Sequence, residues 1–147
     1  MIQSFRGETS MKQVNWLGLV VALIAGQVIG VIWYGNLFSA AWMEAQSLTD
    51  ADFVGQDWKM GLGVLNMIVI LLGLDWLIRR LGASGYMAGA KVALAACVCF
   101  ALTVAALNYI YAAGTLSLLL IDGGYQVVTY TVAGALLGGL KRKPKAA

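Results

Sequence analysis

The sequence contains no histidine, and this absence restricts the chemistry open to the protein. Histidine is the commonest ligand for haem, zinc and copper and the commonest general base in enzymes. The chain also lacks a glycine-rich phosphate loop, a nucleophile with a nearby base, and a pair of catalytic carboxylates. We therefore expect no enzymatic activity, no metal site and no cofactor.

Cysteine is scarce as well, and Cys97 and Cys99 both lie within an apolar run. Their spacing fits neither a disulfide framework nor a zinc site. Two positions apart on a helix, they point about 200° away from each other, so they cannot share a metal ion or form a disulfide together. We expect both to pack as small apolar side chains.

Charged residues make up only 12% of the chain, whereas hydrophobic residues make up 61%. A water-soluble domain of 147 residues does not need this composition, nor a mean hydropathy of +0.80. The net charge of +3 would suit nucleic acid, but the basic residues gather near predicted membrane edges instead of forming a stripe. The sequence thus predicts an integral membrane protein, with the lipid bilayer as its solvent and no nucleic-acid partner.

Four segments are long and apolar enough to cross a bilayer as helices, which requires about 20 residues each. They cover residues 14–34, 60–78, 88–111 and 116–140. The first exceeds the apolar run of a signal peptide, roughly 7 to 15 residues, and ends in the interfacial pair Trp33 and Tyr34, so we expect it to be retained. The predicted fold class is all-α: a polytopic four-transmembrane-helix bundle forming a single domain over residues 1–147.

The distribution of cations predicts the orientation of this bundle. Nine of the ten Lys and Arg residues fall on one side: two precede the first span, Arg79, Arg80 and Lys91 bracket the connection between the second and third, and Lys141, Arg142, Lys143 and Lys145 follow the fourth; Lys59 is the exception. Because cationic loops remain in the cytoplasm, we expect both termini there. In the outer connection, residues 47–52 have hydroxyl and carboxyl side chains suited to capping a short helix, which we expect to lie on the membrane surface.

Small residues recur at every fourth position on three spans, where they allow close approach between helices. They are Gly18, Ala22, Gly26 and Gly30 on the first span, Gly89, Ala93, Cys97, Ala101 and Ala105 on the third, and Gly134 and Gly138 on the fourth. Such faces pack within a four-helix bundle, or one of them is spare and binds another protein. The sequence does not assign the faces.

Polar side chains within the spans gather in the predicted outer half. They are Gln27, Asn66, Asn108, Asp122 and Gln126, with Lys59 as the only cation on that side. A charged residue at the bilayer centre costs roughly 2.5 to 3.5 kcal/mol on insertion scales, so these groups should face the bundle and have partners. We expect one polar cluster, with an ion pair between Asp122 and Lys59, that serves either as hydrogen bonding between helices or as a solute or proton site. Near the inner interface, Asp75 and Arg79 are four apart, which predicts a local salt bridge.

Several short patterns resemble a known family. They are residues 14–17, which open the first span; Trp33, Tyr34 and Gly35 with Leu37, Phe38 and Trp42 after it; Leu48 and Thr49; and Ile121, Asp122, Gly123, Gly124 and Tyr125 in the fourth span. In these patterns the chain resembles small bacterial four-helix membrane proteins classed as a domain of unknown function. The resemblance supports the topology and implies no activity.

The chain departs from the family pattern at two positions. Members often have proline at the position of Asn36 and histidine at that of Gln126, so any chemistry of that histidine is missing here. Members also commonly begin close to the Asn15–Trp16 pair, which makes residues 1–10 an expected extension and Met11 an alternative start.

Two functions remain open from the sequence. The first is a non-catalytic accessory or structural subunit that packs against other membrane proteins or against copies of itself, as the smooth helix faces suggest. The second is a small-solute transporter or channel that uses Asp122, Gln126, Asn66 and Asn108 at its outer mouth. Because four helices are few for a path, that second function predicts a homo-oligomer.

Overall fold

The computed structural model describes residues 14–140, and all regular structure in this part of the chain is helical. The expected extension over residues 1–10 and the basic run after the fourth span lie outside the described residues. The elements in chain order are α1 (Trp16–Ile32), a π-helix (Trp33–Leu37), α2 (Ser39–Ala45), a 3-10 turn (Asp50–Phe53), α3 (Trp58–Arg80), α4 (Tyr86–Ala96), a second π-helix (Cys97–Ala101), α5 (Leu102–Tyr111) and α6 (Leu116–Gly139).

Three helical segments are long and apolar enough to cross a membrane: Trp16–Leu37, Trp58–Arg80 and Tyr86–Tyr111. They coincide with the first three predicted spans, and the last of them combines α4 and α5 into one continuous helix. The fourth predicted segment forms α6, which is 24 residues long. It is not among the three apolar segments, because Asp122, Gln126 and several threonines, tyrosines and glycines interrupt its apolar sequence.

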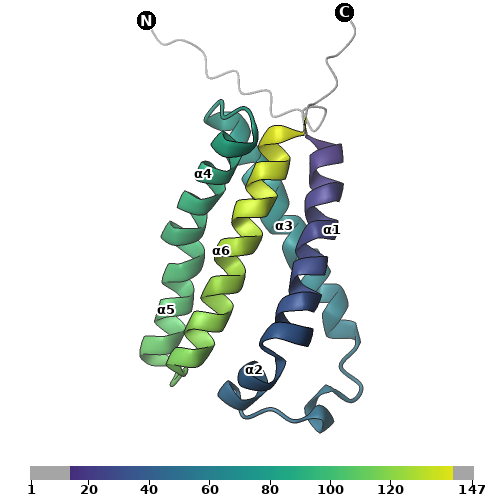
Figure 1. Cartoon of the computed structure of the whole chain (residues 1–147), viewed down its shortest axis with the longest axis vertical. Coiled ribbons are helices and arrows are strands. Elements are labelled where there is room, and N and C mark those ends of the chain that lie inside the picture. Colours follow the sequence, from purple (N-terminus) through teal and green to yellow (C-terminus); the bar gives the residue numbers. More distant parts are fainter. Residues whose placement is uncertain (1–13, 141–147) are drawn as a thin grey trace, which may run out of the picture.

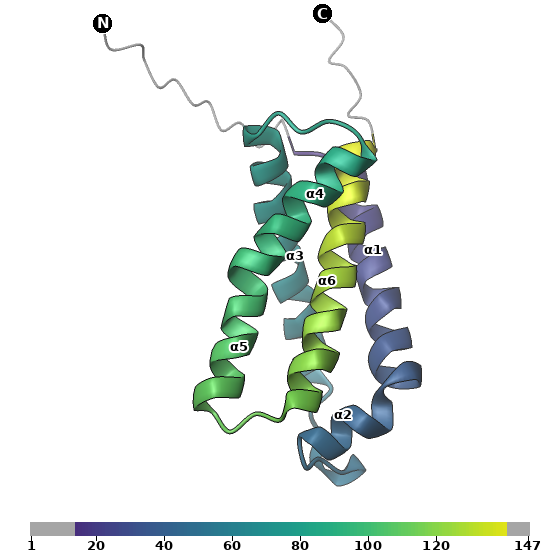
Figure 2. The ribbon, with the colours of Figure 1, turned by 60° about the vertical axis from the view of Figure 1, so that its left-hand side comes forward.

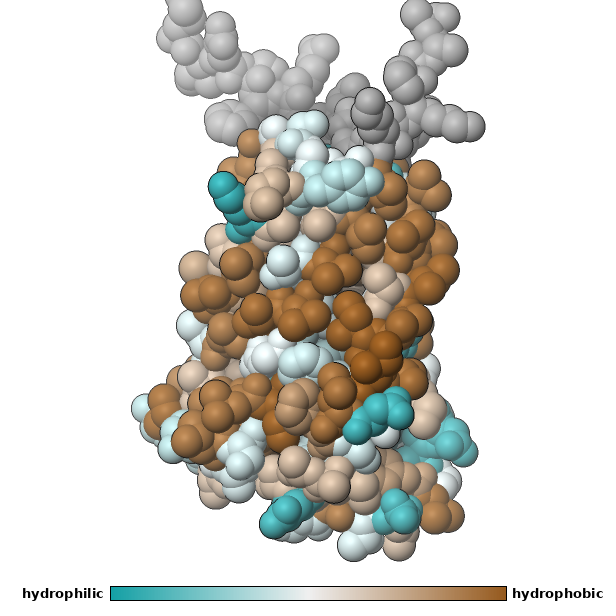
Figure 3. Space-filling view, viewed as in Figure 1, coloured by the Kyte–Doolittle hydropathy of each residue, from teal (hydrophilic) through white to brown (hydrophobic). Residues whose placement is uncertain are grey.

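The long helix α6, which lacks an apolar stretch like those of the other three, lies at the centre of the molecule. It packs along α4 and α5 on one side and along α1 on another, and it also contacts α3 (Figures 1 and 2). Apolar side chains cover much of the middle of the molecule on the face in Figure 3. This arrangement turns the polar groups of α6 toward protein and leaves the more apolar helices facing outward, as a lipid environment requires.

One buried amide joins the start of α1 to the end of α6. The side chain of Asn15 accepts a hydrogen bond from the backbone N–H of Gly18 at 3.1 Å and so caps α1. Its Nδ2 donates to the carbonyl oxygens of Leu137 and Leu140, each at 2.9 Å. These carbonyls belong to the last turn of α6, where backbone acceptors lack helical partners. We call this end of the molecule the terminal end, and the opposite end, which carries α2, the loop end.

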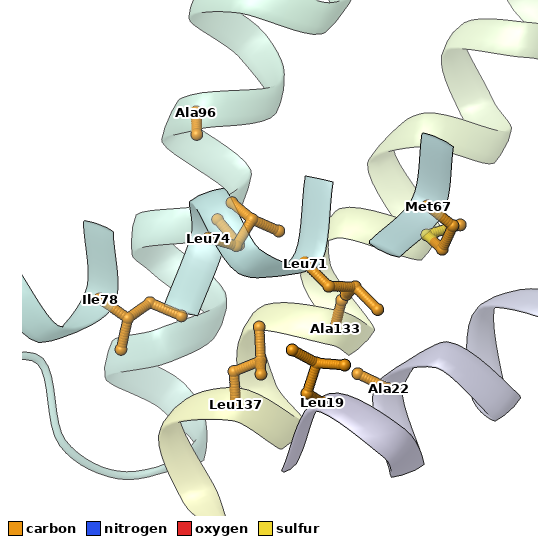
Figure 4. Packing of buried hydrophobic residues seen from close by; sticks show 10 residues of the cluster. Leu19, Ala22, Met67, Leu71, Leu74, Ile78, Ala96, Ala133 and Leu137 are labelled. Atoms are coloured by element: carbon orange, nitrogen blue, oxygen red, sulfur yellow. The ribbon is translucent and has the colours of Figure 1, made fainter. Parts of the chain in front are cut away.

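The apolar core lies in the half of the molecule nearer the terminal end. Its members come from the first turns of α1, the middle and second half of α3, α4 and the second half of α6 (Figure 4): Leu19, Ala22, Met67, Leu71, Leu74, Ile78, Ala93, Ala96, Ala133 and Leu137. Leu71 and Ala93 are completely buried. None of these core residues comes from α2 or α5, so the terminal half holds the long helices together.

The small-residue faces pack inside the molecule. A Cβ atom on Gly134 would clash with the Cβ of Ala93 and with the carbonyl oxygen of Gly89, so α4 and α6 are in backbone contact. The backbone N–H of Gly85, just before α4, also donates to the carbonyl of Gly138 at 2.9 Å. On α1, a Cβ atom on Gly26 would lie 3.0 Å from the Cε of Met67. Each of the three predicted faces thus has a neighbour within the same chain.

The two cysteines have different surroundings, because helical residues two positions apart point to opposite sides. Cys97 is buried, as expected for a small packing residue, whereas Cys99 is exposed on the surface. The expectation that both cysteines pack inside is therefore wrong for Cys99.

The connection between α1 and α3 contains two short helical pieces. The backbone N–H and the hydroxyl of Thr49 both donate to Oδ2 of Asp52 at 2.8 Å, and these bonds lower the pKa of Asp52. The predicted cap is therefore present, but the helix that it begins is only the 3-10 turn Asp50–Phe53. A second short helix, α2, precedes it and was not predicted from the sequence.

Replacement of Asn15 tests the junction at the terminal end. Asn15→Ala removes the cap and exposes two carbonyls, and caps alone contribute about 1 kcal/mol. Asn15→Asp keeps the acceptor for Gly18 but turns a carboxylate toward the two carbonyls, so we expect it to lower stability at least as much as alanine. Unfolding in detergent, followed by circular dichroism, measures both. Asn36→Asp is the matched control, because this position is exposed and its side-chain amide makes one long hydrogen bond, to the carbonyl of Val31 at 3.4 Å. Wild-type stability of Asn15→Asp would contradict the proposed role of the amide.

Replacement of Gly134 tests the contact between α4 and α6. Gly134→Ala forces the two helices apart, and overpacking of this kind costs about 1–3 kcal/mol. Gly73→Ala is the control, because a Cβ atom there meets nothing within 4 Å and alanine favours a helix more than glycine does. Thermal unfolding of both variants should show a loss for Gly134→Ala and no loss for Gly73→Ala; equal behaviour of the two would rule out the close helix contact.

Candidate functional site

The π-helical end of α1 directs two aromatic side chains onto α6. Isolated π-helical turns occur frequently at functional sites, because the wider turn re-aims side chains. The indole N–H of Trp33 donates to the carbonyl of Ile121 at 3.0 Å, and the hydroxyl of Tyr34 donates to Oδ1 of Asp122 at 2.9 Å. These bonds connect residues 88 positions apart in the sequence.

Asp122 is also bound from α2. The indole N–H of Trp42 donates to the same Oδ1 at 3.2 Å. Because an indole N–H can only donate, this oxygen must act as an acceptor. Oδ2 of Asp122 receives no hydrogen bond from the residues that the structure describes, so the carboxyl group retains one oxygen for another donor.

Aromatic rings surround this carboxyl group. The ring centre of Tyr34 lies 5.0 Å from that of Tyr125 and 5.4 Å from that of Trp42, and aromatic pairs at such distances contribute roughly 0.5–1.5 kcal/mol each. Gly124 makes room for the group, since a Cβ atom there would lie only 3.0 Å from Cζ2 of Trp33. We call Trp33, Tyr34, Trp42, Asp122 and Tyr125 the aromatic–carboxylate cluster.

A large cavity opens beside the aromatic–carboxylate cluster, between α1, α2, α3 and α6. Its volume is about 1100 Å³, close to the upper end of typical ligand pockets, which run to about 1,000 Å³. Tyr34, Trp42, Asp122 and Tyr125 form part of its wall. On the α3 side the wall includes Gly61 and Gly63, where no side chain fills the space. The hydroxyl of Thr129, also in the wall, is buried and has no hydrogen-bond partner of good geometry among the described residues.

A smaller cavity of about 370 Å³ lies between α5 and α6. Asn108 borders it together with Asp122 and Gln126. Asp122 and Gln126 also border the large cavity, so this stretch of α6 separates the two.

The structure brings most of the predicted polar residues to these two cavities. Gln27, Asn66, Asp122 and Gln126 line the large one, and Asn108 lines the small one. These residues share cavity walls but are not joined in a hydrogen-bond network. Among the described residues, the side-chain hydrogen bonds to this set are the two that Asp122 accepts from Tyr34 and Trp42. Among residues 14–140 no group of three or more acidic, cysteine or histidine side chains could hold a metal ion.

The predicted ion pair between Asp122 and Lys59 is not formed. The ammonium of Lys59 lies 5.9 Å from the ring centre of Trp58, at the exposed start of α3, and Lys59 lines neither cavity. Two aromatic donors already bind the carboxylate, and a long lysine side chain near a membrane edge extends toward water. Within the described residues the one ion pair is that between Arg79 and Asp75, at 2.9 Å, as the sequence predicted.

The sequence did not identify the aromatic members of the site. Trp33 and Tyr34 were interpreted as interfacial anchors, which is the usual role of tryptophan and tyrosine at span ends. The family resemblance contained a further signal, because two of the stretches that carry it, one with Trp33, Tyr34 and Trp42 and the other over residues 121–125, contact each other in the structure.

The fold and the site define a helical protein with three segments able to cross a membrane and a cavity between its long helices. Residues 17–138 match the family described as Protein of unknown function (DUF1761), and the chain belongs to this family. The resemblance to a domain of unknown function is thereby confirmed, and the matched range includes the whole aromatic–carboxylate cluster. Comparisons with curated proteins and with solved structures give no match.

A double-mutant cycle tests the bond between Tyr34 and Asp122. Tyr34→Phe keeps the ring and removes the donor, and a hydrogen bond to a charged group contributes about 1.5–3 kcal/mol. We expect Tyr34→Phe and Asp122→Asn each to lower unfolding stability, with a coupling of roughly 1 kcal/mol between them. Tyr111→Phe, at a side chain that is 82% exposed, is the control. Strictly additive losses in thermal unfolding would show that the two side chains do not interact.

Proposed function

We propose that the protein is a four-span protein of the bacterial inner membrane, with both termini in the cytoplasm, that binds a small solute in the large cavity. The length of α6 supports its assignment as the fourth span, since 24 residues rise about 36 Å as a helix. The hydrogen bonds at the terminal end support an even number of crossings, because they join the start of α1, the start of α4 and the end of α6.

The charges at the two ends support the orientation. Arg79 and Arg80 end α3 at the terminal end, whereas the loop end carries Glu44, Asp50, Asp52 and Asp57. Cationic connections stay in the cytoplasm, so the cavity, which lies in the half near α2, would open toward the outer side.

The observation that carries the solute proposal is a cavity with polar walls in an otherwise apolar molecule. Polar groups within membrane helices are costly, and they mark substrate or ion pathways more often than chance. Gln27, Asn66 and Gln126 line a space that ordinary apolar side chains at Gly61 and Gly63 would fill. A protein that needs only to pack has no use for this arrangement.

The cavity supports a binding site and not an open pore. Its deep wall includes Met67 and Ile70, and beyond them the buried side chains of Leu71, Leu74 and Ile78 fill the terminal half. Passage of a solute would require these helices to move apart or a further path between copies of the chain. A transporter that works as a homo-oligomer is one form of the proposal.

The accessory-subunit hypothesis has less support in the structure. Its main argument was a spare small-residue face, and the faces on α1, α4 and α6 all have neighbours within the molecule. Exposed apolar side chains remain as evidence for protein partners, such as those of Ile24, Val69 and Phe100. Lipid accounts for them equally well.

Cysteine labelling tests whether the cavity is open to water. In a Cys97→Ala/Cys99→Ala background, Asn66→Cys should react with a membrane-impermeant maleimide added to the outer side of oriented membranes. Leu65→Cys, one position away at a side chain that is 56% exposed and lines neither cavity, should react much less.

A cavity-filling pair completes this test. Gly63→Phe should block the labelling of Asn66→Cys, because its ring occupies the cavity, whereas Gly73→Phe, on the same helix with equally open surroundings, should not. Equal labelling of Asn66→Cys and Leu65→Cys, with no effect of Gly63→Phe, would contradict a water-accessible solute site.

A further inference from the structure

Among the described residues, the wall of the large cavity carries one charged side chain, which is the carboxylate of Asp122. No Lys or Arg of this part of the chain lines the cavity. Lys59, the cation nearest to the cavity along α3, lies over the ring of Trp58 at the exposed start of that helix, and Arg79 and Arg80 lie at its other end. An anionic solute would therefore meet a carboxylate and no cationic partner, whereas a cationic solute would meet a carboxylate with a hydrogen-bond acceptor to spare.

Aromatic faces reinforce this preference. Tyr34, Trp42 and Tyr125 line the cavity beside Asp122, and their rings pack against one another with centres 5.0–5.4 Å apart. The negative faces of such rings attract a cation, more strongly when the cation is desolvated. The hydrogen bonds from Tyr34 and Trp42 to Oδ1 hold the carboxylate in place and leave Oδ2 without a donor among the described residues.

The remaining walls indicate that the cation is organic. A metal ion such as Ca²⁺ takes six or more oxygen ligands at short distance, several of them carboxylates, and no group of three or more Asp, Glu, His or Cys side chains that could hold a metal exists among residues 14–140. The cavity is too large for a bare ion, at about 1100 Å³. Met43, Phe53, Met60, Val64, Met67 and Ile70 offer apolar and polarizable contacts to a carbon skeleton.

We propose that the ligand is a hydrophobic organic cation, an alkylammonium or aryl-substituted cation; this inference rests on the proposed solute site. The positive centre lies between Oδ2 of Asp122 and the rings of Tyr34, Trp42 and Tyr125. The apolar body extends toward Met67 and Ile70, and the amides of Gln27, Asn66 and Gln126 bind polar substituents of the ligand.

Two ions of nearly the same shape and opposite charge test the proposal. The purified full chain in zwitterionic nanodiscs is titrated by calorimetry with tetraphenylphosphonium and, separately, with tetraphenylborate; empty nanodiscs and the Gly63→Phe protein correct for partition into lipid. We expect saturable binding of the phosphonium that Gly63→Phe removes, and no saturable binding of the borate.

Variants at the carboxylate provide the sharper test. Asp122→Asn should weaken phosphonium binding at least about tenfold, which corresponds to 1.4 kcal/mol. Asp50→Asn, which removes an acid that lines neither cavity, should leave binding unchanged. Should Asp122→Asn fail to fold, Asn66→Lys serves instead: it adds a cation at an exposed position in the cavity wall, and it should abolish phosphonium binding and permit borate binding.

The outcomes separate the cation inference from the solute site itself. Saturable phosphonium binding that depends on Asp122 supports both. Equal binding of both ions, or phosphonium binding unaffected by Asp122→Asn and Asn66→Lys, overturns the cation inference. Binding of neither ion also overturns the cation inference. In that case the solute site stands if Asn66→Cys still reacts with the maleimide and Gly63→Phe blocks the reaction. The solute site fails together with the cation inference if that labelling is absent.

Discussion

A carboxylate among long apolar helices has to be covered by protein that offers it donors, and the architecture follows from how α6 meets this constraint. Asp122 lies almost two turns into α6, which begins at Leu116. Apolar side chains cannot solvate it, so α6 occupies the centre and the three helical segments with long apolar stretches surround it (Figure 2). The donors that reach it come from the end of α1 and from α2, which explains why the chain folds back against the molecule after its first long helix.

Two further features make this central position possible. The glycines of α4 and α6 bring the backbones into contact, so that α6 is enclosed closely along its second half. Near the start of α6, Gly124 leaves space for the Trp33 ring, whose N–H donates a hydrogen bond to the carbonyl of Ile121. Small residues on α6 thus serve opposite purposes at its two ends: tight helix contact at the terminal end and aromatic packing at the loop end.

The sequence predicts the four long helices well because hydrophobic length is a strong signal. It also predicts the salt bridge between Asp75 and Arg79, a contact set by spacing along one helix. It fails where a contact joins distant segments. Lys59 was assigned to Asp122 as the nearest opposite charge, but Tyr34 and Trp42 are the actual donors, and only the three-dimensional path of the π-helix and α2 places them there. Gln27, Asn66 and Gln126 were expected in one polar cluster, either as hydrogen bonding between helices or as a solute site. In the structure they line a space, and an empty volume leaves no periodic pattern in a sequence.

The uneven distribution of the core has a mechanical consequence. The second half of α3 is anchored by Leu71, Leu74 and Ile78, while its first half borders the cavity and carries two glycines with open surroundings. Helices remain stiff over such lengths, and stability within a protein follows the local density of buried contacts. The first half of α3 therefore extends from the apolar core as a stiff segment. A small change in the tilt of α3 at the packing around Leu71 would produce a larger change in the width of the space beside Asp122.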